Sequence, residues 1–229
     1  MKQVYARMGI EGHPNVVYVD RHKNFWASIP NKGVVAYNQQ QQTSYEFGYT
    51  NDAVGIPQGA ICSISECRDG AILVYEDGRL VCCDIMHQQH TVWQTDYVAE
   101  NNLRHTKSLK AFADQMDNIW LYGQGTLMMY NKNTNHWDAS IGNQLGLLSV
   151  STDHIVNGMA GDRSGNIWIG TDRSGLLRMN VNTHEIEHVA PRSFNDQQSI
   201  IQEVIGVQSL YVDDSDLLWV GTEKAGVAY

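Results

Sequence analysis

The chain is organised as short runs of apolar and aromatic residues separated by turns rich in Asp, Asn, Gly and Ser. Some runs are continuously apolar, and others, such as Glu185–Val189, alternate between polar and apolar positions. No stretch shows the 3.6-residue spacing of an amphipathic helix. Short runs bounded by turn residues are typical of β-strands, so the pattern predicts an all-β protein.

One motif returns along the chain at a nearly constant interval. Its clearest copy is Asp162-Arg-Ser-Gly-Asn-Ile-Trp168-Ile-Gly-Thr171, which recurs as Asp213-Asp-Ser-Asp-Leu-Leu-Trp219-Val-Gly-Thr222. Weaker copies run from Asp20 to Trp26 and from Asp114 to Trp120, and a fifth, Cys67 to Leu73, lacks both the Asp and the Trp. The tryptophan positions of the five copies, with Leu73 standing in for the missing tryptophan, are 47, 47, 48 and 51 residues apart. The repeat is therefore about 48 residues long.

Each repeat predicts four short strands. An inner strand ends at the Asp, which holds a turn through its side chain, and the next strand carries the Trp into the core. A glycine-containing turn leads to a third strand, and a polar turn leads to an outer strand. Four-stranded repeats of this length predict a β-propeller built of five antiparallel blades. We interpret the recurring residues as structural: Asp20, Trp26, Asp114, Trp120, Asp162, Trp168, Asp213 and Trp219.

The start of the chain suggests how such a propeller closes. Lys2–Met8 reads as an outer strand with no blade before it, and the last repeat stops at Tyr229 after its third strand. We therefore expect the N-terminal strand to complete the last blade, so that residues 1–229 form one five-bladed domain. The alternative is that the chain is a fragment of a larger propeller region, such as a seven-bladed ring.

Composition and charge limit the kinds of partner that the chain can bind. The net charge of −9 and the lack of a Lys/Arg cluster argue against nucleic acid as a main partner. No apolar run is long enough to span a membrane. The four cysteines lie between Cys62 and Cys83, where a pairing of Cys62 with Cys82 or Cys83 stays open, as does the oligomeric state.

Loops at one edge of the blades are the customary binding surface of a propeller. Polar and charged side chains there could hold a glycan or another polar small ligand through hydrogen bonds. The candidate residues are Lys32, Arg104, His105, Gln124, His154, Arg173 and Lys224.

The sequence indicates no metal, no cofactor and no catalytic residues. His13, His105 and His154 lie in similar register, but they lack a matching carboxylate and are interpreted as unrelated exposed histidines. Cys82 and Cys83 are adjacent, so on a strand they point to opposite faces and cannot share one tetrahedral metal with His87 and His90. The predicted inner strands contain no histidine, which argues against an enzyme.

The pattern D-x-x-G-x-I/L-W-I/V-G-T resembles the two-component regulator propeller repeat, most clearly over Asp162–Met179 and Asp213–Tyr229. Such repeats form the extracytoplasmic sensor regions of hybrid two-component histidine kinases of Bacteroides-like bacteria. The resemblance implies a periplasmic, ligand-sensing or signal-relaying propeller whose partners are the other domains of a sensor kinase. Residues 1–7 lack the apolar run of a secretory signal, so this location rests on the resemblance alone.

The resemblance does not imply kinase activity for this chain, which has neither a phosphoacceptor region nor a nucleotide-binding glycine loop. The ligand that we expect is carbohydrate-like. The alternatives are a protein-interaction scaffold that uses the same loop edge and, less favoured by the residues, a propeller lyase or lactonase.

Overall fold

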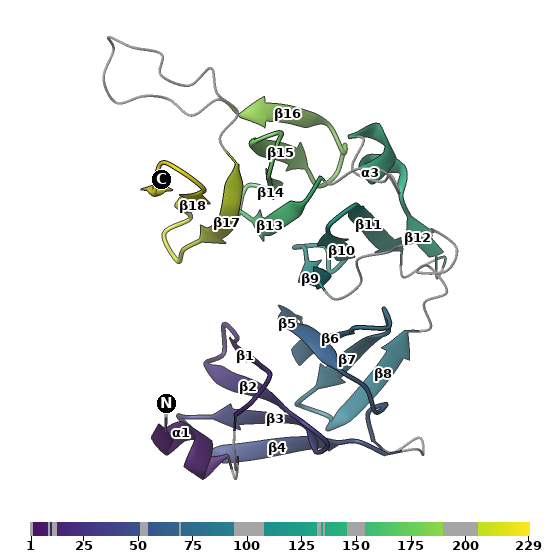
Figure 1. Ribbon diagram of the computed structural model, residues 1–229, viewed down its shortest axis with the longest axis vertical. Helices are drawn as coiled ribbons and strands as arrows, with labels where there is room; N and C mark the ends of the chain where they lie inside the picture. The colour runs from purple at the N-terminus through teal and green to yellow at the C-terminus, as the bar shows by residue number, and fades with distance from the viewer. Residues whose placement is uncertain are drawn as a thin grey trace. The chain divides into compact units, whose positions relative to one another are not determined.

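The computed structural model describes residues 2–8, 10, 13–50, 55–68, 70–93, 108–131, 134, 136–145, 154–189 and 206–229. These residues form five sheets that follow one another along the sequence (Figure 1). The chain divides into two compact units, Met1–Ala113 and Asp114–Tyr229. We number the sheets as blades 1 to 5.

Four blades have four strands each, in sequence order across the sheet, and the strand pairs are antiparallel. The bounds are as follows: blade 1 comprises β1 (Val16–Val19), β2 (Asn24–Ile29), β3 (Gly33–Asn38) and β4 (Thr43–Gly48); blade 2 comprises β5 (Ile61–Cys67), β6 (Gly70–Tyr75), β7 (Leu80–Asp84) and β8 (Gln89–Trp93); blade 3 comprises β9 (Lys110–Ala113), β10 (Ile119–Gly123), β11 (Thr126–Asn131) and β12 (His136–Asp138); blade 4 comprises β13 (Val156–Gly161), β14 (Asn166–Thr171), β15 (Leu176–Asn180) and β16 (Ile186–Val189). In the described residues, blade 5 has three strands, which are β17 (Val207–Val212), β18 (Leu218–Thr222) and β19 (Val227–Ala228). The predicted all-β fold of four-stranded antiparallel blades is confirmed.

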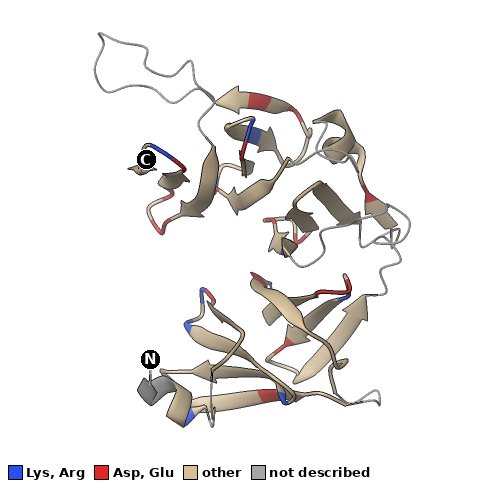
Figure 2. Ribbon diagram, viewed as in Figure 1, with Lys and Arg blue, Asp and Glu red and all other residues tan. Residues whose placement is uncertain are grey.

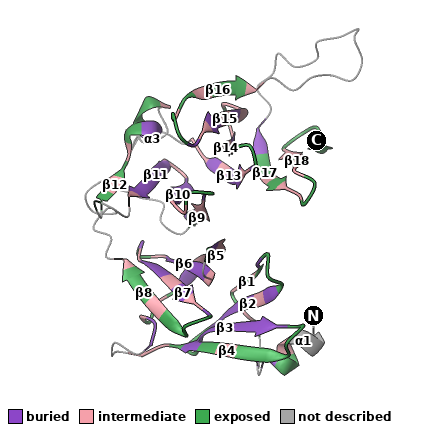
Figure 3. Ribbon diagram, turned by 180° about the vertical axis from the view of Figure 1, so that it is seen from behind, coloured by how far each residue is buried: buried purple, intermediate pink, exposed green. Residues whose placement is uncertain are grey.

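The middle strands carry the core, and the outer strands face water (Figure 3). All six residues of β3 are buried, whereas β4 is largely exposed and no residue of β16 is buried. Between blades 1 and 2, Trp26 belongs to an apolar cluster that includes Ile64 and Leu73. Charged residues gather in the turns and on the outer strands (Figure 2). The turns and the outer strands are therefore the polar parts of each blade.

The N-terminal segment differs from the expectation. A strand over Lys2–Met8 was predicted to complete the last blade, and this prediction is wrong because Lys2–Arg7 forms helix α1. Tyr5 and Met8 are three positions apart, which places them on one face of a helix but on opposite faces of a strand. Both side chains pack on blade 1, where Met8 is buried beside Val35. The segment therefore covers a face of blade 1. A second short helix, α3 (Ser140–Gln144), follows β12.

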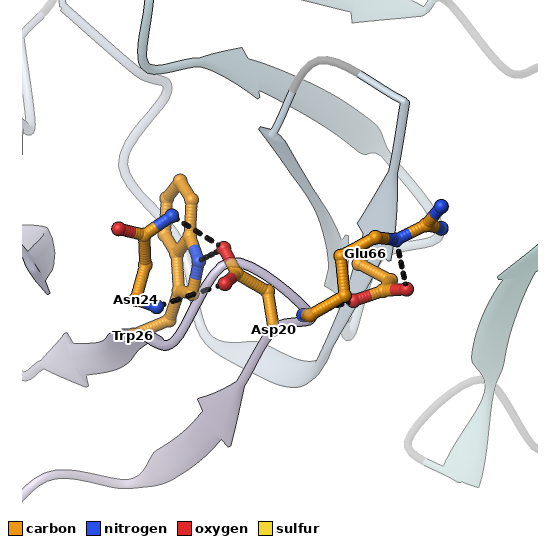
Figure 4. A network of polar contacts seen from close by, with 5 residues as sticks. Asp20, Asn24, Trp26 and Glu66 are labelled. Carbon is orange, nitrogen blue, oxygen red and sulfur yellow. Dashed lines mark hydrogen bonds and ion pairs between the residues drawn. The ribbon is translucent and has the colours of Figure 1, made fainter. Parts of the chain in front are cut away.

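A carboxylate at the end of the inner strand holds each regular blade together, as Figure 4 shows for Asp20 of blade 1. In blade 1, Asp20 accepts hydrogen bonds from the backbone and side-chain N–H groups of Asn24, each at 2.8 Å, and from Trp26 Nε1 at 2.9 Å. One aspartate thus fixes the turn through its Oδ1 atom and orients the core tryptophan through its Oδ2 atom. Hydrogen bonds to an ionised acceptor are stronger than those between neutral groups. We call this arrangement the aspartate clasp.

The clasp recurs with nearly identical geometry. The Trp Nε1 to Asp Oδ2 distance is 2.9 Å for Trp120 and Asp114, 2.9 Å for Trp168 and Asp162, and 2.8 Å for Trp219 and Asp213. An asparagine four residues after the Asp completes the clasp in the first, third and fourth blades, as Asn24, Asn118 and Asn166. The tryptophans of the four clasps differ in burial: Trp26 and Trp120 are fully buried, Trp168 is half-buried and Trp219 is 38% exposed.

The residue after the clasp aspartate connects neighbouring blades in two places. Arg21 donates from its backbone N and from Nε to the Glu66 carboxylate of blade 2, at 2.8 and 2.7 Å. Arg163 reaches from blade 4 to blade 5 in the same way, where it contacts Asp216 and the backbone carbonyl of Asp214. These exposed contacts align the turns of adjacent blades.

Replacing Asp20 with alanine should lower the free energy of unfolding by about 3 kcal/mol, because the buried Trp26 and Asn24 N–H groups lose their acceptor. Urea denaturation followed by circular dichroism measures this change. Asp213→Ala is the matched control. It removes the Trp219 Nε1 bond and two backbone N–H bonds from an exposed turn where water can replace them, so its effect should be smaller. Equal losses in the two variants would contradict the role of burial.

The acid stability of the chain should depend on Asp162. Burial opposes ionisation of this carboxyl, but hydrogen bonds from Asn166 and Trp168 outweigh burial and hold its pKa below the ordinary value. Since the folded pKa is lower than the unfolded one, the clasp stabilises the fold above about pH 4, and this contribution is lost as the pH falls through the folded pKa. Thermal unfolding of wild type and Asp162→Asn between about pH 7 and about pH 2.5 tests this. The variant should be less stable at neutral pH, and the difference should shrink in acid; parallel curves would refute the assignment.

Candidate functional site

The turn between β14 and β15 presents charged side chains at the edge opposite the aspartate clasp of blade 4. Thr171, fully buried at the end of β14, donates from Oγ1 to the Gly175 carbonyl at 3.0 Å and accepts the Ser174 N–H at 2.8 Å. Gly175 has a φ of 67°, a left-handed conformation that glycine adopts without strain. These constraints hold Asp172 and Arg173 at the tip of the turn.

Asp172 joins this turn to the start of its own blade. Its Oδ1 atom accepts the Ile155 N–H at 2.9 Å, and its backbone N–H donates to the Ile155 carbonyl at 3.0 Å. The Nδ1 atom of His154 lies 3.7 Å from the same Oδ1, is buried and has no hydrogen-bond partner among the described residues. The Arg173 side chain is 54% exposed, with its Nε 3.5 Å from Asp172 Oδ2. The site therefore places an imidazole, a carboxylate and a guanidinium together.

The β10–β11 turn of blade 3 adjoins this group. The Gly125 N–H donates to the His154 carbonyl at 2.8 Å, and Gln124 forms a β-bridge with Ile155. Three residues predicted from the sequence, Gln124, His154 and Arg173, thus lie around Asp172. We call these four residues the turn cluster. Asp172 directly precedes Arg173 in the same polar turn, which the sequence predicts as part of the loop edge.

Blade 5 extends the same edge. A Cβ atom added at Gly206 would lie 2.9 Å from the Asp172 carbonyl oxygen and 3.1 Å from Glu223 Oε2. The Glu223 N–H donates to the Gly206 carbonyl at 2.9 Å, which sets the β18–β19 turn beside the turn cluster. Lys224 belongs to that turn, so a fourth predicted residue lies on the same edge of the second unit.

The remaining predicted residues lie elsewhere. Lys32 is in the β2–β3 turn of the first unit, where its Nζ is 3.9 Å from Glu46 Oε1. Arg104 and His105 lie outside the described residues.

A second polar turn lies between β6 and β7. Arg79 donates from Nε to Asp77 Oδ2 at 2.8 Å, donates to the Gln58 carbonyl at 2.9 Å and lies over the Tyr75 ring. Burial opposes ionisation of Asp77, but the hydrogen bonds and charge of Arg79 hold its pKa below the ordinary value. These contacts tie Arg79 into the turn, so we place the candidate site at the turn cluster.

The cysteines and histidines between Cys82 and His90, which superficially resemble a metal site, contact different parts of the structure. Cys83 is fully buried in the core between blades 1 and 2, and His87 Nδ1 lies 2.6 Å from Asp84 Oδ2. In the part of the chain that the structure describes, no three His, Cys, Asp or Glu side chains are grouped to hold a metal ion. No helix in the described ranges has the length and hydropathy needed to cross a bilayer.

Comparison with known families identifies the repeat. The family model described as "Two component regulator propeller" matches residues 149–173. Residues 149–173 thus match one two-component regulator propeller repeat. The matched residues include β13 and β14 with the clasp of Asp162 and Trp168, and they also include His154, Asp172 and Arg173 of the turn cluster. No curated protein matches the chain.

Solved structures share the fold at low sequence identity. The extracellular domain assigned to a hybrid two-component system of Bacteroides thetaiotaomicron is 17% identical, with a TM-score of 0.57, over 95% of this chain and 27% of that domain. The chain thus spans about a quarter of that domain's length. The β-propeller domain of Myceliophteria thermophila Cps50 (Swd1) is 12% identical, with a TM-score of 0.56, over 93% of this chain and 64% of that chain. Virginiamycin B lyase of Staphylococcus aureus is 10% identical, with a TM-score of 0.54, over 94% of this chain and 68% of that chain. These similarities support the propeller fold of the blades.

Replacing Thr171 with valine should lower the free energy of unfolding by about 1–2 kcal/mol, because the buried turn loses the hydroxyl that bonds Gly175 and Ser174. Urea denaturation measures the loss. Thr183→Val is the control, since the Thr183 hydroxyl bonds Glu185 in an exposed turn and its removal should cost less. A Thr171→Val variant as stable as wild type would show that the hydroxyl does not hold the turn.

Proposed function

We propose that this chain forms part of the extracytoplasmic sensor region of a two-component system and binds a carbohydrate-like ligand at the turn cluster. The observation that carries the proposal is the match of the two-component regulator propeller repeat to residues 149–173, which contain three of the four turn-cluster residues. The similar domain from B. thetaiotaomicron is extracellular and is assigned to a hybrid two-component system, which agrees with this role.

The chemistry of the turn cluster suits a ligand with many hydroxyl groups. Arg173 offers several N–H donors, Asp172 offers carboxylate acceptors, and the amide of Gln124 can do either. Because a cationic and an anionic side chain lie side by side, the cluster favours a neutral polar ligand over a strongly charged one. The net charge of −9 likewise disfavours polyanions.

We infer binding rather than catalysis for this chain. The cluster is built of turn residues whose contacts shape an edge, and the ligand would be recognised by hydrogen bonds at that edge. The signal would then pass to further domains of the sensor as a change in how the bound blades contact them.

Calorimetric titration with a panel of neutral oligosaccharides tests the ligand. We expect at least one glycan to bind and Arg173→Ala to weaken its affinity by roughly tenfold or more, since a hydrogen bond to a charged group is lost. Arg163→Ala is the matched control, because Arg163 lies in the β13–β14 turn, at the other edge of the same blade. It should bind as wild type does.

Two results would contradict the proposal. No binding to any glycan of the panel would favour a protein-interaction scaffold, and equal affinities for Arg173→Ala and wild type would place the ligand elsewhere. The sensor role is tested separately by the full reading frame, which should encode a transmembrane helix followed by a histidine kinase. A complete gene without them would refute that part.

A further inference from the structure

Blade 2 replaces both partners of the aspartate clasp. Cys67 stands at the position of the aspartate and Leu73 at that of the tryptophan. Leu73 is fully buried in the core with Trp26, so the apolar role of the tryptophan is kept and its hydrogen bond is lost. Cys67 has a different neighbour: its Sγ lies 3.3 Å from Cys82 Sγ.

The backbone brings the two sulfur atoms together. Cys67 ends β5 and pairs with Gly70, the first residue of β6. A Cβ atom added at Gly70 would lie 1.9 Å from the Cys83 carbonyl oxygen, so this turn rests directly on β7 beside Cys82. Only glycine allows so close an approach. The contact between the sulfurs is therefore fixed by the packing of the turn against β7.

The other two cysteines make different contacts. Cys62 Sγ donates to the backbone carbonyls of Val74 and Leu109, at 3.3 and 3.5 Å. Burial raises the pKa of the Cys62 thiol to about 11, and it raises the pKa of the fully buried Cys83 thiol further. A raised pKa disfavours the thiolate, which is the form that attacks a disulfide.

We propose that Cys67 and Cys82 are a redox site that forms an intramolecular disulfide. The oxidant is a small disulfide or a disulfide-exchanging protein. One thiolate attacks the oxidant and forms a mixed disulfide, and the second thiolate displaces the other half of the oxidant. Two thiols are thereby oxidised to one disulfide, the oxidant is reduced to two thiols, and the two protons go to the released thiols or to solvent.

The cross-link replaces the clasp with a covalent bond. A disulfide bond is about 2.05 Å long, so the sulfurs need to approach by roughly 1.3 Å. The bond would join the β5–β6 turn to β7 between residues that are 15 positions apart in the sequence. Glu66, which binds Arg21 of blade 1, precedes Cys67 in the chain. Oxidation therefore stiffens the turn through which blades 1 and 2 are connected, and this holds whether or not the proposed ligand binds.

The wild-type chain, equilibrated with oxidised glutathione, tests the site. We expect its mass to fall by about 2 Da, its thiol count after denaturation to fall from four to two, and dithiothreitol to reverse both changes. The melting temperature of the oxidised chain should be roughly 5–10 °C higher than that of the reduced chain. Digestion after Glu66 separates Cys62 from Cys67 and should leave the fragment that begins at Cys67 joined to the Cys82 peptide.

Two double variants assign the bond to Cys82 or to Cys83, which are adjacent in the sequence. Cys62→Ala/Cys83→Ala keeps the proposed pair and should oxidise as wild type does. Cys67→Ala/Cys82→Ala keeps Cys62 and Cys83 and should retain both thiols. The proposal is overturned if wild type keeps four thiols, if it ends as a stable mixed disulfide with glutathione, or if the second variant cross-links and the first does not.

Discussion

The hydrogen bond between an aspartate carboxylate and a tryptophan Nε1 is the interaction on which the regular blades depend. Asp162 shows how much one carboxylate does: its Oδ1 accepts the backbone N–H groups of Ser164 and Asn166, and its Oδ2 accepts Trp168 Nε1. The first two bonds shape the turn, and the third fixes the next strand in the sheet. Because that strand ends at Thr171, the clasp at one edge also sets where the turn cluster stands at the other.

Variation among the blades follows from burial. Where the tryptophan is fully buried, as Trp26 is, an unpaired indole N–H would be costly, and the carboxylate removes that cost. Blade 2 has no polar group at the tryptophan position. Because the buried Leu73 needs no hydrogen-bond acceptor, a cysteine, Cys67, can occupy the position of the aspartate. Losing both partners together is far less damaging than losing one. The degenerate repeat is thus a consistent alternative to the clasp, and it places a thiol beside a second thiol.

Much of this fold could be predicted from the sequence because the repeat is visible in residue types and spacing. The structural roles of the aspartates and tryptophans and the four-stranded unit could be predicted from the repeated motif, whose clearest copies contain Trp168 and Trp219. The helix at Lys2–Arg7 could not be predicted, since six residues carry too little periodicity to separate a helix from a strand, and packing on Val35 decides it. The turn cluster was predictable as a set of polar turn residues. The central place of Asp172 was not, because it depends on a backbone contact with Ile155. The contact of Cys67 with Cys82, which are not on adjacent strands, likewise depends on how the turn packs.

The central claim is that buried indole N–H groups bonded to carboxylates hold the blades. Hydrogen exchange of the tryptophan indole protons, followed by nuclear magnetic resonance on 15N-labelled protein, measures this directly. The account predicts that the Nε1 protons of Trp26 and Trp120 exchange far more slowly than that of Trp219, which makes the same bond at an exposed position. Exchange of Trp26 and Trp120 as fast as that of Trp219 would contradict it.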